Sequence, residues 1–161
     1  MKRLFFILFF FSLLALWGCG REESILDYQT KSIKAECIIN GKYGVLLEKN
    51  EQGRTITVQE PEEAAGISFI IGEKITAVSG DTRIELDKDA LGGICAIGEI
   101  FSQEKECLTN ASSVDGGSVL TFSNDGRIYQ ITLGKNSLPH YVRISSKDFE
   151  YEIEILSIEL T

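Results

Sequence analysis

The sequence predicts an α+β protein in which a strongly curved antiparallel sheet surrounds one central helix. Apolar and polar residues alternate with a period of two in about nine or ten short segments. Turn residues separate these segments, as in an antiparallel meander. After Leu86 the period changes once to that of a helix. A single helix among so many short strands favours a sheet that wraps around it.

The first half of the chain accounts for six of these strands. Residues 32–39 alternate, and Asn40-Gly41 predicts a hairpin turn into a strand over residues 43–47. Pro61 suits the first position of a short helical turn. The remaining strands of this half are predicted at residues 55–58, 67–71, 74–79 and 82–86.

The helix is predicted over residues 90–104, where apolar residues recur at helical spacing. Gly92, Gly93 and Gly98 each lower helix stability by up to about 1 kcal/mol relative to Ala. The helix therefore needs tertiary packing, and its glycines allow a close approach to the sheet.

The second half resumes the strand pattern after a predicted polar loop at residues 110–117. In the last strand, Phe149 to Ile155 alternate regularly and the register then shifts at Leu156, which predicts a β-bulge. The strands of this half are predicted at residues 119–122, 128–133, 141–145 and 149–160.

The amino terminus has the features of a secretory signal. Lys2 and Arg3 precede a run of apolar or neutral residues at 4–17, which is short for a spanning helix. The run ends in Leu16-Trp17-Gly18-Cys19, which resembles the lipobox of bacterial lipoprotein precursors, although Trp17 is bulkier than usual. The resemblance implies a signal peptide over residues 1–18, diacylglycerol on Cys19 and a lipidated tether over residues 19–30. An uncleaved membrane helix or an ordinary secretory signal are the alternatives.

The charge of the chain argues against nucleic-acid binding. The 161 residues carry 16 Lys and Arg against 24 Asp and Glu, a net charge of −8. Without residues 1–18 the balance is 14 against 24, a net charge of −10. Anionic lipid headgroups repel such a surface, so the acyl chains must hold the domain at the membrane.

Residues 31–161 form the predicted domain, and their order of elements resembles a known family. The resemblance rests on the lipobox, the meander, the Pro61 turn before Gly66-Ile67-Ser68-Phe69, the central helix and Leu138-Pro139 before the last two strands. These features look like the lipoprotein carrier and receptor proteins LolA and LolB, and more closely like small anchored Gram-positive lipoproteins with that fold. The resemblance implies a half-open barrel with an apolar concave face that binds acyl chains or serves as an interaction scaffold.

No catalytic or metal-binding motif emerges from the sequence. His140 has no nucleophile and carboxylate arranged around it and is interpreted as a solvated turn residue. Carboxylates around the helix are interpreted as caps or solvated groups; they are Asp87, Asp89, Glu99, Glu104 and Glu106. Three cysteines remain after lipidation, and a Cys95–Cys107 disulfide stays open as the alternative to buried thiols.

The sequence therefore predicts a non-enzymatic, extracytoplasmic lipoprotein without cofactor or metal, anchored by its lipid to the cell membrane, or to the outer membrane in a Gram-negative source. The predicted ligand is a lipid or lipoprotein acyl chain. Ile94, Ile97 and Phe101 are the candidates to line its cavity, with simple core packing as the alternative. The alternative function is a scaffold that presents a sheet edge to an envelope or spore-germination partner.

Overall fold

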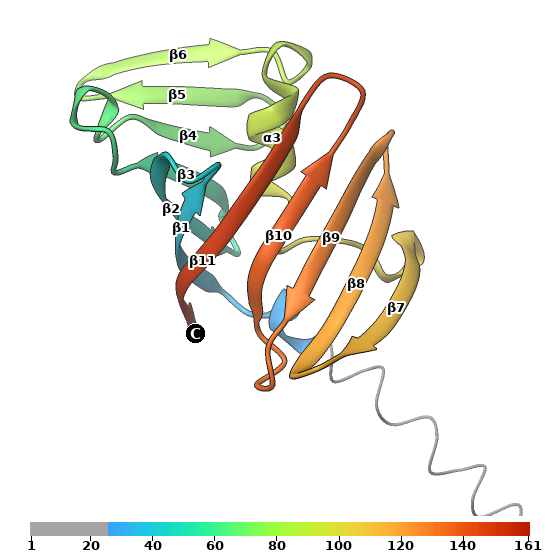
Figure 1. The fold of residues 1–161 in the computed structure, drawn as a ribbon. Helices are drawn as coiled ribbons and strands as arrows, with labels where there is room; N and C mark the ends of the chain where they lie inside the picture. The colour runs from blue at the N-terminus through green and yellow to red at the C-terminus, as the bar shows by residue number, and fades with distance from the viewer. Residues whose placement is uncertain (1–25) are drawn as a thin grey trace, which may run out of the picture.

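The computed structural model describes residues 26–161 and contains one antiparallel sheet of 11 strands (Figure 1). The strand order is β6-β5-β4-β3-β2-β1-β11-β10-β9-β8-β7. The strands are β1 (Ile33–Ile39), β2 (Tyr43–Asn50), β3 (Gly53–Val58), β4 (Ser68–Ile71), β5 (Ile75–Ser79), β6 (Thr82–Leu86), β7 (Leu108–Val114), β8 (Gly117–Asn124), β9 (Arg127–Leu133), β10 (Pro139–Ser145) and β11 (Glu150–Leu160).

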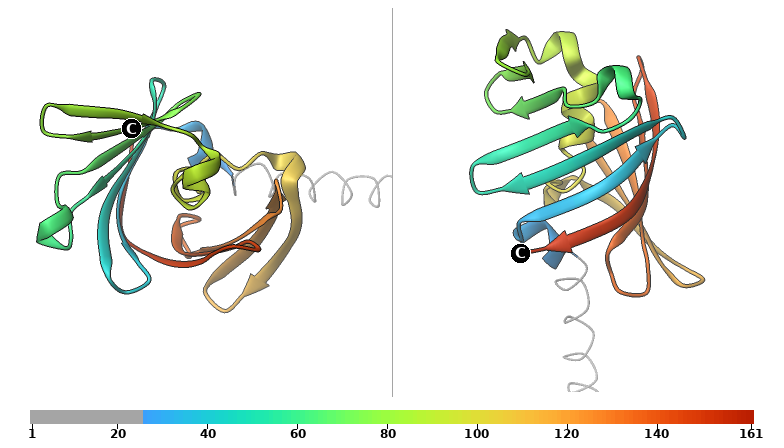
Figure 2. Two further views of the ribbon diagram at one scale, coloured as in Figure 1. Left: turned by 90° about the horizontal axis from the view of Figure 1, so that it is seen from above. Right: turned by 90° about the vertical axis from the view of Figure 1, so that its left-hand side faces the viewer.

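Two meanders, β1–β6 and β7–β11, make up this sheet, and the pairing of β1 with β11 joins them. β6 and β7 are the two edges and do not pair, so the sheet curves without closing. Seen from above, it wraps around α3 (Gly92–Gly98), which lies on the connection between the two edges (Figure 2). The predicted fold class is therefore confirmed.

Short 3-10 helices occupy the connections. They are η1 (Asp27–Thr30), η2 (Glu62–Ala64), η3 (Asp89–Leu91) and η4 (Lys105–Cys107). η2 follows Pro61, where the sequence predicted a helical turn. η1 lies at the lower end of Figure 1, and the Tyr28 side chain there is 3% exposed. Tyr28, which was expected to belong to the tether over residues 19–30, thus contributes to the core.

Local sequence signals set the hairpins and the strand register. Asn40 and Gly41 have φ angles of 52° and 63°, as the predicted hairpin turn requires. Glu36 pairs with Ser157 while Cys37 pairs with Ile155, so Leu156 is the extra residue of a β-bulge. The bulge was predicted at this residue.

One predicted element was wrong, and another was predicted too long. Residues 110–117 were expected to be a loop, but β7 covers Leu108–Val114 and pairs with β8. β7 is an edge strand with almost no buried side chain, so it lacks the alternation that marks the other strands. The central helix was expected over residues 90–104, but α3 ends at Gly98. After Gly98 the chain forms turns over residues 99–101, and residues 102–104 connect it to η4.

The core fills the space between α3 and the concave face of the sheet. Ala96 and Ile100 on the helix side and Phe122, Ile131 and Ile153 on the sheet side are each 0% exposed. Gly93 faces the Tyr151 ring and Gly98 faces Ile71, each too closely for a Cβ atom to fit without movement of that side chain. The predicted close approach through glycine is thus confirmed for these two positions.

We expect Gly98→Ala to destabilise the fold by about 1–3 kcal/mol, because the new Cβ overlaps the Cδ1 atom of Ile71. This cost exceeds the helix-propensity gain of up to about 1 kcal/mol. Ile71→Val removes that Cδ1 atom and should itself cost about 0.5–1.5 kcal/mol. The double variant should be no less stable than Ile71→Val alone, a coupling that denaturant unfolding measures. If the stability losses of the two single variants added up in the double variant, the close contact between Gly98 and Ile71 would be contradicted.

Candidate functional site

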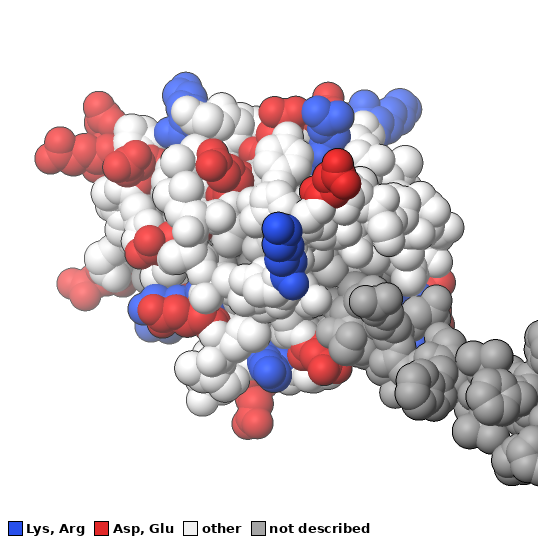
Figure 3. Space-filling view, turned by 60° about the horizontal axis from the view of Figure 1, so that its bottom comes forward, with Lys and Arg blue, Asp and Glu red and all other residues white. Residues whose placement is uncertain are grey.

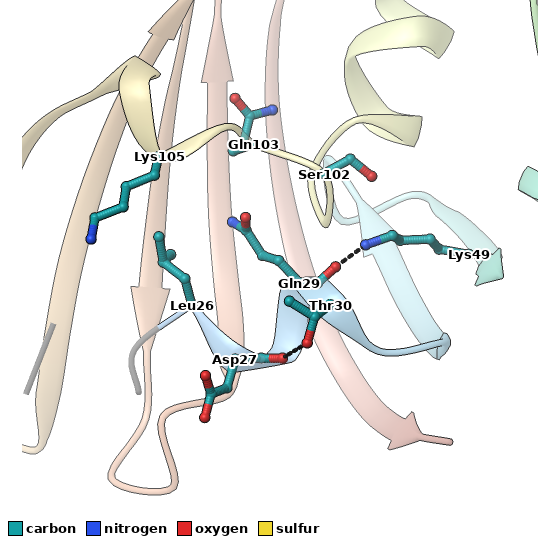
Figure 4. A pocket seen from close by; sticks show the side chains of 8 residues that line it. All are labelled: Leu26, Asp27, Gln29, Thr30, Lys49, Ser102, Gln103 and Lys105. Carbon is teal, nitrogen blue, oxygen red and sulfur yellow. Dashed lines mark hydrogen bonds between the residues drawn. The ribbon is translucent and has the colours of Figure 1, made fainter. Parts of the chain in front are cut away.

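A cavity of about 550 Å³ opens at the lower end of the sheet, between η1 and the connection that follows α3 (Figure 4). Its size suits a small ligand. The lining residues come from three separate parts of the chain; they are Leu26, Asp27, Gln29, Thr30, Lys49, Ser102, Gln103 and Lys105.

Hydrogen bonds from Lys49 connect η1, the lower wall of this cavity, to the rest of the fold. Its Nζ atom donates hydrogen bonds to the carbonyl oxygens of Gln29 in η1 and, at 2.9 Å, of Phe101. The Tyr28 ring packs edge-on against Phe101, with 6.5 Å between ring centroids. Burial raises the pKa of Tyr28 to about 12, in keeping with an apolar setting for this ring. η1 is therefore an integral wall of the cavity.

Gln103 places a buried amide in the opposite wall. The residue is 3% exposed, and its Nε2 atom donates to the carbonyl oxygen of Glu99 at 2.9 Å. Within residues 26–161, its Oε1 atom is the single buried side-chain oxygen or nitrogen that has no hydrogen-bond partner. Buried polar atoms usually have partners, so this acceptor marks an unsatisfied position next to the cavity.

Glu99 forms a second polar cluster, between the end of α3 and β9. Its Oε2 atom accepts hydrogen bonds from Arg127 Nη1 and from the Tyr129 hydroxyl, each at 3.0 Å. Burial raises the pKa of Tyr129, so this hydroxyl stays protonated and donates. The cluster holds one carboxylate with two donors, an arrangement that joins the helix to the sheet.

The structure brings Ile97 and Phe101 into the core, where they are 6% and 3% exposed. Ile94 is partly buried and packs against the same core. None of the three lines the cavity at the lower end. The cavity is lined instead by residues that include Lys49, Gln103 and Lys105, and these three were not identified from the sequence. Cys19, the predicted lipidation site, lies outside the described residues.

The other chemical candidates are separate from this cavity. His140 is exposed at the start of β10, beside a smaller cavity of about 180 Å³. Asp87 Oδ1 accepts a hydrogen bond from the Asp89 backbone N–H ahead of α3, as a turn-capping residue does. Over residues 26–161, no group of His, Cys, Asp and Glu has the arrangement of a metal site.

The three cysteines of the described chain are free thiols, so Cys95 and Cys107 form no disulfide. Cys37 and Cys95 are buried. Burial, and secondarily the neighbouring carboxylate of Glu36, raises the pKa of the Cys37 thiol to about 12. This thiol is therefore protonated and unreactive at neutral pH.

We expect the stability of the fold to decline between pH 9 and pH 10 through Cys37. The unfolded thiol loses its proton near pH 9, whereas the folded one keeps it up to about pH 12. The folded state thus binds more protons than the unfolded state in this window. Once the unfolded thiol is ionised, each further pH unit lowers the free energy of unfolding by about 1.4 kcal/mol. Urea unfolding under reducing conditions at pH 8 and pH 10 measures the decline. Cys37→Ala should reduce it, and Cys107→Ala should not; an equal decline in both variants would refute the assignment.

Comparison with known proteins gives similarity in fold alone. No family model matches the sequence, and no curated protein matches it. An uncharacterised conserved protein from Thermus thermophilus has a similar structure, with a TM-score of 0.49 and 11% identity over 86% of each chain. The chain is also similar to the structure of a LolA superfamily protein from Nitrosomonas europaea, with a TM-score of 0.45 and 11% identity over 86% of this chain and 93% of that one.

Proposed function

We propose that this protein is an extracytoplasmic lipoprotein, anchored through diacylglycerol on Cys19, whose non-catalytic domain binds a hydrophobic ligand such as a lipoprotein acyl chain. The cavity at the lower end of the unclosed sheet carries this proposal. Leu26, the first described residue, lines that cavity, so residues 20–25 alone separate the cavity wall from the proposed anchor at Cys19.

The tether length supports uptake of a ligand from the bilayer. Leu26 lies seven positions after Cys19, and a fully extended chain of seven residues spans at most about 25 Å. A diacylglycerol on Cys19 would therefore keep the cavity within about one tether length of the lipid surface. An acyl chain then passes between bilayer and cavity over a short distance.

The surface of the domain supports a lipid anchor as the means of membrane attachment. Figure 3 shows acidic and basic side chains interspersed over the lower end, without a continuous basic patch on that face. Among residues 26–161, no helix has the length and hydrophobicity needed to cross a bilayer. Two acyl chains bind membranes stably because each buried CH₂ group contributes about 0.8 kcal/mol.

Binding in the cavity is a passive process in this proposal. Apolar surface leaves water with a gain of about 25 cal/mol per Å². Because packed side chains fill the space beneath α3, the ligand enters at the lower end, past Leu26 and Ser102. Movement of α3 would be required for Ile94, Ile97 and Phe101 to contact the ligand, and this contact stays a prediction.

We expect Ser102→Trp to reduce lipid binding by the full-length protein at least tenfold, because the indole would occupy the cavity that Ser102 lines. Mass spectrometry of lipids that copurify with the protein measures the effect. Ser79→Trp is the matched control, since Ser79 is exposed at the end of β5 and distant in the fold from η1. This control should retain the lipid.

Two outcomes of this experiment would count against the cavity. Equal lipid content in Ser102→Trp and Ser79→Trp would place the ligand elsewhere, and loss from an Ile94→Asp variant alone would place it beneath α3. Absence of lipid from the wild-type protein would favour the scaffold function.

The second candidate function, a protein-interaction scaffold, is favoured by the open edge of β7. Six of its seven residues are exposed, and the strand contains no charged residue and no proline. Such an edge can accept an extended segment of another protein by strand addition. The opposite edge, β6, carries Arg83 and Glu85, and Lys74 pairs with Glu85, so it is protected by charge. A photo-crosslinker at Ser112 should then capture one envelope protein, whereas the same group at Arg83 should not.

A further inference from the structure

Two cations lie directly opposite each other on the concave face of the sheet. Lys49 of β2 pairs in register with Arg54 of β3. Lys49 shares its strand face with the buried residues Val45 and Leu47, and Arg54 shares its face with the buried residue Ile56. Like charges directly opposite in a sheet are destabilising, so this pair needs a compensating interaction.

Among residues 26–161, no carboxylate forms an ion pair with either cation. Within the described chain, the ion pairs involve Lys74, Arg127 and Arg143, and neither Lys49 nor Arg54 takes part in one. The acceptors of Lys49 are the two backbone carbonyl oxygens of Gln29 and Phe101, which are neutral. Burial, and secondarily the charge of Arg54, lowers the pKa of Lys49, as expected where an anion is missing.

A second lysine lies on the other side of the cavity. Lys49 lines one side of it, and Lys105, on η4, lines the other (Figure 4). Asp27 is the one carboxylate among the eight lining residues, and its side chain points away from Lys49 and Gln103. Two lysines and one carboxylate thus line this cavity, in a chain whose net charge is −8.

We infer that the cavity binds an amphiphile with an anionic head group, a carboxylate or a phosphate, on an acyl chain. This inference rests on the proposed function and specifies its ligand class. The head group lies between Lys49 and Lys105, where charge-assisted hydrogen bonds to an oxyanion are strong. Arg54, behind Lys49, adds attraction without lining the cavity. The acyl chain extends past Leu26 toward the membrane.

Binding of three matched probes tests this inference. The full-length protein is placed in nanodiscs of zwitterionic phosphatidylcholine, and binding of dodecanoate, dodecyl phosphate and 1-dodecanol is measured after subtraction of empty nanodiscs. We expect at least one anionic probe to bind tenfold or more tightly than 1-dodecanol. Which of the two anions binds identifies carboxylate or phosphate as the head group.

Charge-removing variants locate the site. Lys105→Gln and Arg54→Gln should each reduce the preference for the anion at least threefold, and Lys105 is exposed, so its replacement leaves the core intact. Lys147→Gln is the matched control because Lys147 is an exposed lysine in the turn between β10 and β11. It should leave the preference unchanged.

The outcomes separate this inference from the proposed function. Equal binding of all three probes would overturn the anionic head group and leave hydrophobic binding in place. An anion preference that Lys147→Gln reduces as much as Lys105→Gln would overturn the site. Failure of every probe to bind would overturn both proposals.

Discussion

Replacement of Cys19 by Ala is expected to move the protein completely from the detergent phase to the aqueous phase in detergent phase separation. The variant loses the thiol that would carry diacylglycerol, and with it two acyl chains whose CH₂ groups contribute about 0.8 kcal/mol each. The net charge of −10 beyond residue 18 offers no electrostatic attraction to anionic lipid in their place. Intact mass measurement should show a glyceride on the wild-type chain, starting at Cys19, and none on the variant.

Gly20→Ala is the matched control, because it changes the neighbouring residue and retains the thiol. It should partition with the detergent and carry the glyceride. The lipoprotein anchor would be refuted by a wild-type chain that begins at Met1, or by a mature chain without an attached glyceride. Retention of the Cys19→Ala variant in the detergent phase would show that another feature holds the protein.

Local signals in the sequence were sufficient for most of the sheet. Asn40-Gly41 predicts a tight hairpin because both residues adopt positive φ with little cost, and both do so. The shift in alternation at Leu156 predicts the bulge because a period of two cannot otherwise keep Ile155 and Ile158 on one face. These features depend on residues close together in the chain, so no tertiary information is needed.

The incorrect predictions concern elements whose presence or length depends on tertiary contacts. β7 exists because β8 pairs with it, and its exposed polar residues give no periodic signal. α3 ends at Gly98, which lies closely against Ile71, a residue 27 positions earlier in the chain. The helical spacing of apolar residues continues to Phe101 because turns after Gly98 also direct side chains into the core.

The cavity was missed, although part of its signal is present in the sequence. Lys49 and Arg54 occupy positions that the alternation assigns to the buried face, and a charged residue there is unusual. That Lys105 and η1 lie on the other sides of the same space requires the fold. Tyr28 gives a weaker signal, because a single apolar ring within a polar segment has no period.

Among residues 26–32, which precede β1, Tyr28 is expected to contribute most to stability. Its side chain is 3% exposed and contacts Phe101 within the main core. Truncation of a buried aromatic ring costs about 3–5 kcal/mol, so Tyr28→Ala should lower the free energy of unfolding by that amount. Domains of this size have total stabilities of about 5–15 kcal/mol, so the variant should be marginally folded. Urea denaturation measures the loss.

Two further variants separate ring burial from other effects of changing η1. The hydroxyl of Tyr28 has one long hydrogen bond, 3.4 Å from Gln29 Nε2, so Tyr28→Phe should cost less than about 1 kcal/mol. Asp27→Ala alters an exposed neighbour and should stay within about 0.5 kcal/mol of wild type. If Tyr28→Ala were as stable as Asp27→Ala, η1 would be part of the tether, and the cavity would lack its lower wall. Because η1 follows the proposed lipid anchor, the same measurement decides whether the domain that faces the membrane begins at η1 or at β1.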